Sequence, residues 1–170
     1  IVKVKIPFRN HPVIISQGNH GPYSHLLIRE GRDLTYSVDF ALPSGTEVVA
    51  SASGLVIDCC DDTIDYYLGM DLERGKNTPS NYISILREDG IVLHYQHFER
   101  GSITRLGIKL CDEIKEDTPI GKTGLSGWIG PTLHLHFMVY PSEGDRIITV
   151  PVKFFGYNGP LNHMELPSIK

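Results

Sequence analysis

The chain has 170 residues, of which 41% are hydrophobic and 21% charged, and its formal net charge is −4. This balance is typical of a folded globular domain with its own core and does not fit a disordered chain. The chain lacks the basic surface expected of a nucleic-acid-binding domain, and no apolar run is long enough to cross a bilayer.

Short runs rich in β-branched and aromatic residues follow one another along the chain and end at Gly, Pro, Asn or Asp, which is typical of β-strands. The predicted strands are Ile1–Ile6, Val13–Ser16, Tyr36–Phe40, Glu47–Ala52, Gly54–Cys59, Tyr82–Arg87, Ile91–His97 and His134–Tyr140. Helical periodicity is scarce. We therefore predict an all-β fold: a mainly antiparallel β domain with long loops.

Turn and loop signals lie between these runs. Glu88-Asp89-Gly90 predicts a hairpin, because Asp-Gly accepts positive φ angles, and Pro43-Ser44-Gly45 predicts another turn. The polar stretch Asp61–Asn81 is expected to be a long loop or to include one helical turn. Past Pro141 the sequence offers one more possible strand, Ile147–Val150. We expect a single domain over 1–170, with its core at about 13–140, an N-terminal strand and a C-terminal extension.

The chain contains three cysteines, Cys59, Cys60 and Cys111. An odd number excludes a fully paired intramolecular framework, and adjacent cysteines are poorly arranged to bond to each other. Free thiols are favoured, although Cys111 could pair with one of the other two. No Cys-x-x-Cys spacing is present, so a cysteine zinc site is not expected.

The segment His134-Leu135-His136 places two imidazoles on one face of a predicted strand, since side chains alternate with period two. Upstream, Asp39 lies between Val38 and Phe40 in another predicted strand, where a buried carboxylate needs a cation or several donors. A catalytic zinc site needs three protein ligands and an open position for water. An aspartate and two histidines would supply such a set.

The order of these residues carries a family resemblance from about Ser16 to about Tyr140. The motifs are Ser24-His25, Tyr36-x-x-Asp39-Phe40-Ala41-x-Pro43-x-Gly45-Thr46-x-Val48-x-Ala50, Gly54-x-Val56, Asn81-Tyr82-Ile83, Tyr95-x-His97, Thr118-Pro119-Ile120-Gly121-x-Thr123-Gly124 and Gly130-Pro131 before His134-Leu135-His136-Phe137. An isolated His-x-His pair is weak evidence, but the whole ordered set is specific. It resembles the M23 peptidases, which are zinc endopeptidases of the lysostaphin and LytM type.

The resemblance implies one Zn²⁺ ion held by His25, Asp39 and His136, and a catalytic pair, His97 and His134, beside the metal. It also implies a groove walled by loops, in which peptides of bacterial cell-wall peptidoglycan are cut. An extracytoplasmic location follows from the resemblance alone, and we expect a monomer.

Two departures from the family pattern stand out. Many members place the first ligand four residues before the aspartate, but here that position is Thr35, which cannot replace an imidazole. The ligand is therefore moved to His25, fourteen residues before Asp39, as in one branch of the family. The second departure is the two-residue insert Thr132-Leu133 between Pro131 and His134.

Other histidines compete with this set. His20 is the local alternative to His25, and His94 is the alternative to His97. In an extended strand His94 and His97 point to opposite faces, so only one is expected at the site, and the Tyr95-x-His97 pattern favours His97. His11 and His163 are predicted to be exposed to solvent.

Weaker expectations concern the groove. Asn81, Tyr95 and Trp128 are candidate substrate-binding residues, with Ser126 beside them, although Trp128 could equally be a packing residue. The 61–81 stretch could act as a lid. Two alternatives to the endopeptidase remain: an inactive relative that regulates or binds the cell wall, and a zinc hydrolase with a different substrate.

Overall fold

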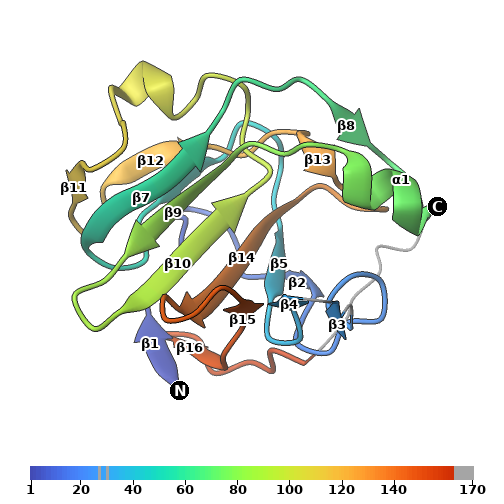
Figure 1. The fold of residues 1–170 in the computed structure, drawn as a ribbon, viewed down its shortest axis with the longest axis horizontal. Helices are drawn as coiled ribbons and strands as arrows, with labels where there is room; N and C mark the ends of the chain where they lie inside the picture. The colour runs from blue at the N-terminus through green and yellow to red at the C-terminus, as the bar shows by residue number, and fades with distance from the viewer. Residues whose placement is uncertain (27, 30, 163–170) are drawn as a thin grey trace.

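A seven-stranded antiparallel sheet forms the centre of the computed structural model, which describes residues 1–26, 28–29 and 31–162 (Figure 1). In spatial order its strands are β11 (Glu113–Ile114), β7 (Gly54–Cys60), β9 (Tyr82–Leu86), β10 (Ile91–Gln96), β14 (His134–Pro141), β5 (Val38–Ala41) and β2 (Ile15–Gln17). The prediction of an all-β, mainly antiparallel fold is confirmed.

Smaller sheets surround the central one. The remaining strands are β1 (Val2–Val4) with β16 (Val152–Phe154), β6 (Glu47–Val49) with β12 (Pro119–Lys122), β8 (Tyr66–Tyr67) with β13 (Gly127–Trp128), and β3 (Ile28–Arg29) with β4 (Arg32–Asp33) and β15 (Ile147–Ile148). Three of these pairings, β1–β16, β8–β13 and β4–β15, are parallel. A 3₁₀ helix, η1, spans Thr104–Leu106.

The predicted strands are all present, with ends that differ by three residues or fewer from the expected ones. The hairpin between β9 and β10 turns where expected, and Gly90 takes a φ of 80° there. The possible strand after Pro141 is confirmed as β15, with its end at Ile148.

The 61–81 stretch contains a single short helix, α1 (Leu72–Asn77). The Asp71 carboxylate accepts a hydrogen bond from the Arg74 backbone N–H at 3.1 Å and caps the helix. The helix ends at Thr78, because the next residue is Pro79 and a residue before proline disfavours the helical conformation. The expectation of a loop with a helical turn is therefore met.

One face of the central sheet packs on the hydrophobic core. The largest fully buried side chains are Tyr95, Phe40, Phe98, Phe137, Phe154, Ile83, Ile85, Leu93, Ile103, Ile120, Ile129 and Leu135. The Tyr95 hydroxyl is satisfied inside this core, since it accepts a hydrogen bond from the Ser51 backbone N–H at 2.9 Å. Such a packed, period-two arrangement holds the strands rigidly in register.

The opposite face carries polar side chains in register. Gln17 pairs with Asp39, Asp39 with His136, and His136 with Gln96, so that a row of polar residues crosses four adjacent strands. This row forms the floor of the candidate site.

All three cysteines are free thiols, as favoured from the sequence. Within the described part of the chain, no helix combines the length and apolar character that crossing a membrane requires.

Candidate metal centre and groove

Asp39 and His136 are direct cross-strand partners on β5 and β14. The His136 Nδ1 atom lies 2.8 Å from Asp39 Oδ1, and both side chains are buried. Period-two alternation places His134 on the same face, with its Nε2 3.7 Å from Asp39 Oδ1. The carboxylate is thus surrounded by imidazoles.

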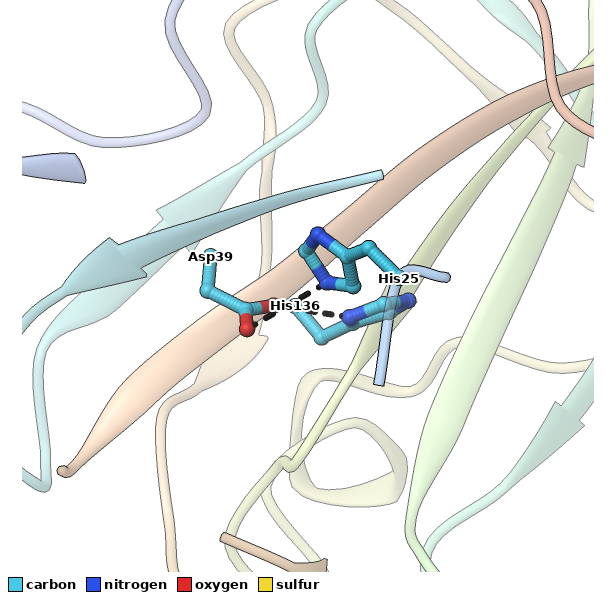
Figure 2. A group of neighbouring side chains, drawn as sticks. All are labelled: His25, Asp39 and His136. Carbon is cyan, nitrogen blue, oxygen red and sulfur yellow. Dashed lines mark hydrogen bonds and ion pairs between the residues drawn. The ribbon is translucent and has the colours of Figure 1, made fainter. Parts of the chain in front are cut away.

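His25 reaches the same carboxylate from a different part of the chain, the loop that follows β2. Its side chain is fully buried, and its Nε2 lies 3.3 Å from Asp39 Oδ2 (Figure 2). Its Nδ1 lies 2.7 Å from the Gly18 carbonyl oxygen. A carbonyl oxygen can only accept, so Nδ1 carries the proton and Nε2 presents a lone pair. That buried Nε2 has no hydrogen-bond partner.

One ligand atom from each of His25, Asp39 and His136 lies within 4.8 Å of the other two. Two imidazole nitrogens and one carboxylate oxygen are the donor types that catalytic Zn²⁺ sites use. The unpartnered Nε2 of His25 also fits a metal ligand, because a buried lone pair without a hydrogen-bond donor is costly unless a cation faces it. The residues present therefore fit a zinc ion.

The electrostatics of the cluster support an ionised Asp39. Burial opposes the charge of this carboxylate, but His134, His25 and His136 outweigh it, and the pKa of Asp39 is held well below its usual value. Burial lowers the pKa of His25, whereas the charge of Asp39 raises it, and on balance the pKa of His25 is raised. Burial lowers the pKa of His136.

His97 and His134 form a second pair beside the cluster, with ring centroids 4.6 Å apart. The Nδ1 of His97 lies 2.7 Å from the Ser126 carbonyl oxygen, and that of His134 lies 2.7 Å from the Thr132 carbonyl oxygen. Both Nδ1 atoms therefore donate, which leaves each Nε2 available. Burial, followed by the neighbouring His134 and His136, lowers the pKa of His97 well below its usual value.

The position of His97 corrects one expectation. Strand β10 ends at Gln96, and His97 has a φ of 76°, so strand alternation does not extend to it. The His97 side chain consequently points to the polar face of the sheet. His94 and Gln96 point to the same face by strand alternation. His94 is not one of the clustered ligand candidates: it is buried, its Nδ1 lies 2.8 Å from Ser84 Oγ, and its ring stacks on Tyr82.

A groove opens over these side chains. Besides Asp39, His97, His134 and His136, it is lined by Ser16, Gln17, Tyr23, Ser24, Arg32, Leu34, Met70, Gly75, Lys76, Thr78, Gln96, Trp128, Ile129, Gly130, Pro131 and Thr132. Residues 16–24 with Arg32 and Leu34 contribute one part of the lining, and α1 with its flanks and the 128–132 loop contributes the other. The 61–81 stretch thus contributes a wall, whereas its action as a lid stays a prediction.

Trp128 lines the groove and also contacts the 69–75 segment that forms part of its wall. The indole Nε1 donates to the Gly69 carbonyl oxygen at 2.7 Å. A Cβ added to Gly75 of α1 would lie 2.3 Å from the indole Cδ2, so the helix backbone rests directly on the ring. Trp128 therefore lines the groove and packs against α1, while its contact with substrate stays a prediction.

Asn81 and Tyr95 do not line the groove, which corrects the expectation that they contact substrate. Both are 0% exposed. The Asn81 amide donates to the carbonyl oxygens of Thr63 and Phe98, and Tyr95 belongs to the core. Ser126 is also buried, and its hydroxyl donates to the Phe98 carbonyl oxygen at 2.8 Å. The side chains of these residues hold loops together.

The remaining sequence candidates lie away from the cluster. His20 and His11 are exposed, and the His20 ring packs edge-on against Tyr36. Thr35, four residues before Asp39, donates its hydroxyl to Asp33. His163 lies outside the described residues.

One residue at the site escaped sequence reasoning. Gln17 is buried and donates to Asp39 Oδ2 at 2.8 Å. A lone amide in a three-residue strand gives no sequence signal, since its importance depends on its cross-strand partner.

The family model described as Peptidase family M23 matches residues 33–147. No curated protein matches the chain.

Several solved structures share the fold. The catalytic domain of the prophage-encoded M23 protein EnpA from Enterococcus faecalis, solved as a point mutant, is 22% identical, with a TM-score of 0.56 over 85% of this chain and 92% of that one. The catalytic domain of the antimicrobial peptidase lysostaphin from Staphylococcus simulans is 24% identical, with a TM-score of 0.51 over 78% and 83%. A zinc-containing peptidase from Vibrio cholerae is 20% identical, with a TM-score of 0.52 over 85% of this chain and 39% of that one.

Proposed function

The chain belongs to peptidase family M23, and from this premise we propose that it is a zinc-dependent endopeptidase that cuts peptide bonds in bacterial cell-wall peptidoglycan. The observation that carries the zinc dependence is the convergence of His25, Asp39 and His136, with an unpartnered Nε2 on His25. The zinc-containing peptidase of similar fold supports the same metal.

His25 through Nε2, His136 through Nδ1 and a carboxylate oxygen of Asp39 would hold the ion. When bound, zinc supplies a Lewis acid that polarises a peptide carbonyl and lowers the pKa of water. The charge of the site would be +1, from Zn²⁺ and one carboxylate. The His25 ring has its orientation fixed by a hydrogen bond to a backbone carbonyl, which is typical of metal sites.

His97 and His134 would perform the proton transfers. Each imidazole is held by an Nδ1–H donation to a backbone carbonyl, which leaves Nε2 as the atom free to act on substrate. A neutral imidazole accepts a proton at Nε2, and a protonated one donates it to a leaving amine or to a developing oxyanion. We assign the proton transfers to these two residues because both line the groove and the His97 ring centroid lies 6.1 Å from that of His136.

The groove supports a peptide as the substrate. It runs past the cluster between two walls and is lined largely by uncharged side chains, with Trp128, Ile129 and Met70 on one side. The antimicrobial peptidase lysostaphin, a neighbour in fold, supports cell-wall peptides in particular. Action on the cell wall also implies an extracytoplasmic location, and we propose that the protein acts as a monomer.

The test is mass spectrometry of the products released from purified peptidoglycan by the zinc-loaded protein and by the same protein after chelation. New peptide ends that form only with zinc are expected. His25→Ala should abolish them, and His20→Ala, which removes the exposed histidine of the same loop, should not.

The other outcomes separate the alternatives. One bound zinc without any cleavage would indicate a hydrolase with a different substrate. If the protein binds no zinc and cuts no peptidoglycan, the proposal is contradicted and a regulator or wall-binding protein is favoured.

A further inference from the structure

The amide of Gln17 uses all of its hydrogen-bonding capacity at one point. Its Nε2 donates to Asp39 Oδ2 at 2.8 Å and to Ser24 Oγ at 2.9 Å. Its Oε1 accepts from the backbone N–H groups of Tyr23 and Ser24, at 3.0 and 3.1 Å. Two donors and two lone pairs are thus all paired, and the contacts fix which end of the amide is which.

These four contacts join two separate parts of the site. Gln17 and Asp39 are cross-strand partners on β2 and β5. Tyr23 and Ser24 belong to the loop that carries His25, whose Nδ1 donates to the Gly18 carbonyl oxygen. Gln17 therefore ties the loop of one candidate ligand directly to the carboxylate of another.

The loop is shaped around this side chain. A Cβ added to Gly21 would lie 2.2 Å from Gln17 Cγ, so only a residue without a side chain lets the loop approach this closely. These hydrogen bonds of Gln17 also matter because His25 is a loop residue. His25 lies in the loop after β2 and not on β5, so the strand that carries Asp39 does not fix its position.

We propose that Gln17 is the positioning residue of the metal centre: it holds the His25 loop against Asp39 and directs the Asp39 carboxylate. This inference rests on the proposed metal site but not on the substrate. A neutral amide suits the task, because it donates to a carboxylate without the charge that would compete with a metal ion. Removing such a partner of a metal ligand typically lowers metal affinity about 10- to 100-fold.

The test compares Gln17→Met with the unchanged protein and with His20→Ala, a matched control in the same loop. Methionine keeps the length of the side chain and removes its donors and acceptors. Zinc affinity is measured by competition with a chelator, and the visible spectrum of the Co²⁺-loaded protein reports the ligand geometry. Circular dichroism and thermal unfolding without metal report folding.

We expect Gln17→Met to bind zinc about 10- to 100-fold more weakly, with an altered Co²⁺ spectrum, while His20→Ala matches the unchanged protein. A purely structural role would lower the unfolding temperature but leave the affinity and spectrum of the folded protein as they were, and that result would overturn the proposal.

Ser24→Ala provides a second route if Gln17→Met does not fold. It removes the acceptor of one amide proton and leaves both backbone contacts, so zinc affinity should fall about fivefold, the effect of one hydrogen bond. Unchanged affinity in that variant would also overturn the inference. If the unchanged protein binds no zinc, the metal site itself is wrong. If it binds zinc but cuts no peptidoglycan, only the proposed substrate fails.

Discussion

At the scale of single residues, the orientation of each imidazole divides the histidines into two groups. His25, His97 and His134 each donate Nδ1–H to a backbone carbonyl oxygen and present Nε2, whereas His136 turns its Nδ1 to Asp39. The compact cluster contains His25 and His136 but neither His97 nor His134. The ligand candidates and the proton-transfer candidates should therefore respond differently to substitution.

We expect His97→Ala and His134→Ala to keep the zinc content of the unchanged protein and to lower kcat about 10²- to 10⁴-fold, the usual range for loss of a general acid or base. His136→Ala should lose the metal as well as the activity. Metal analysis alongside single-turnover rates separates the two cases. Loss of zinc from His97→Ala would show that the division is wrong.

The sequence predicted some of these residues better than others. Strand alternation alone places His134 and His136 on one face, and the structure has them there. His25 depended on the family resemblance, because a loop histidine carries no pattern. His97 lay beyond the reach of alternation, since its positive φ reverses its direction, and Gln17 depends on a cross-strand partner that no local pattern reveals.

At the scale of elements, α1 and the 128–132 loop form one wall, and the Trp128 indole joins them. The long strands were predictable because burial on one face imposes period two on their sequences. The two-residue strands β3, β4, β8 and β13 were not, because a run of two cannot show a period. Those short strands belong to or adjoin the groove walls, so the shape of the groove was the least predictable feature.

Gly75→Ala should disturb that wall, because its Cβ would lie 2.3 Å from the Trp128 ring. We expect a severalfold higher KM for peptide substrate, little change in kcat, and a loss of about 1–3 kcal/mol in stability from overpacking. Trp128 is the only tryptophan of the chain, so its fluorescence reports the displacement directly.

Glu73→Ala is the matched change on α1, since the Glu73 side chain is 77% exposed and its ion pair is with Lys76. It should leave KM and the fluorescence unchanged. If Gly75→Ala leaves them unchanged too, the contact of α1 with Trp128 does not shape the groove.

At the scale of the whole molecule, zinc should stabilise the fold by mass action, because three distant segments supply the candidate ligands and the unfolded chain does not hold them together. With free zinc at about 1,000 times its dissociation constant the gain is about 4 kcal/mol. For a domain of this size, that corresponds to a rise in Tm of roughly 10 °C. Thermal scans with zinc and with chelator measure it, and His25→Ala should show no zinc-dependent shift.

Stability should also depend on pH through His94, which is not one of the ligand candidates but interacts electrostatically with His136. Burial is the main reason that the pKa of His94 falls from 6.5 to about 3 in the folded protein. At pH values between these two pKa values, His94 is protonated in the unfolded chain and neutral in the folded protein. The contribution of neutral His94 is therefore fully present above the ordinary pKa and is lost as the pH falls toward that of the folded state.

The metal-free protein and metal-free His94→Gln, compared by urea unfolding across this range, isolate that contribution. The unchanged protein should lose up to about 1.4 kcal/mol more per pH unit than the variant. Parallel pH profiles would mean that His94 is protonated equally in the two states.

The pairing of β5 with β14 also has a consequence for how the chain acquires its fold. Asp39 and His136 are partners across 97 residues of sequence. Contacts of such high sequence separation are entropically costly to close and slow the folding of β proteins. A chain still being synthesised has no complete chelating set until His136 has emerged and β14 has docked. If the proposed function holds, uptake of the metal would follow the docking of β14, and a chain that lacks His136 would not acquire the activity.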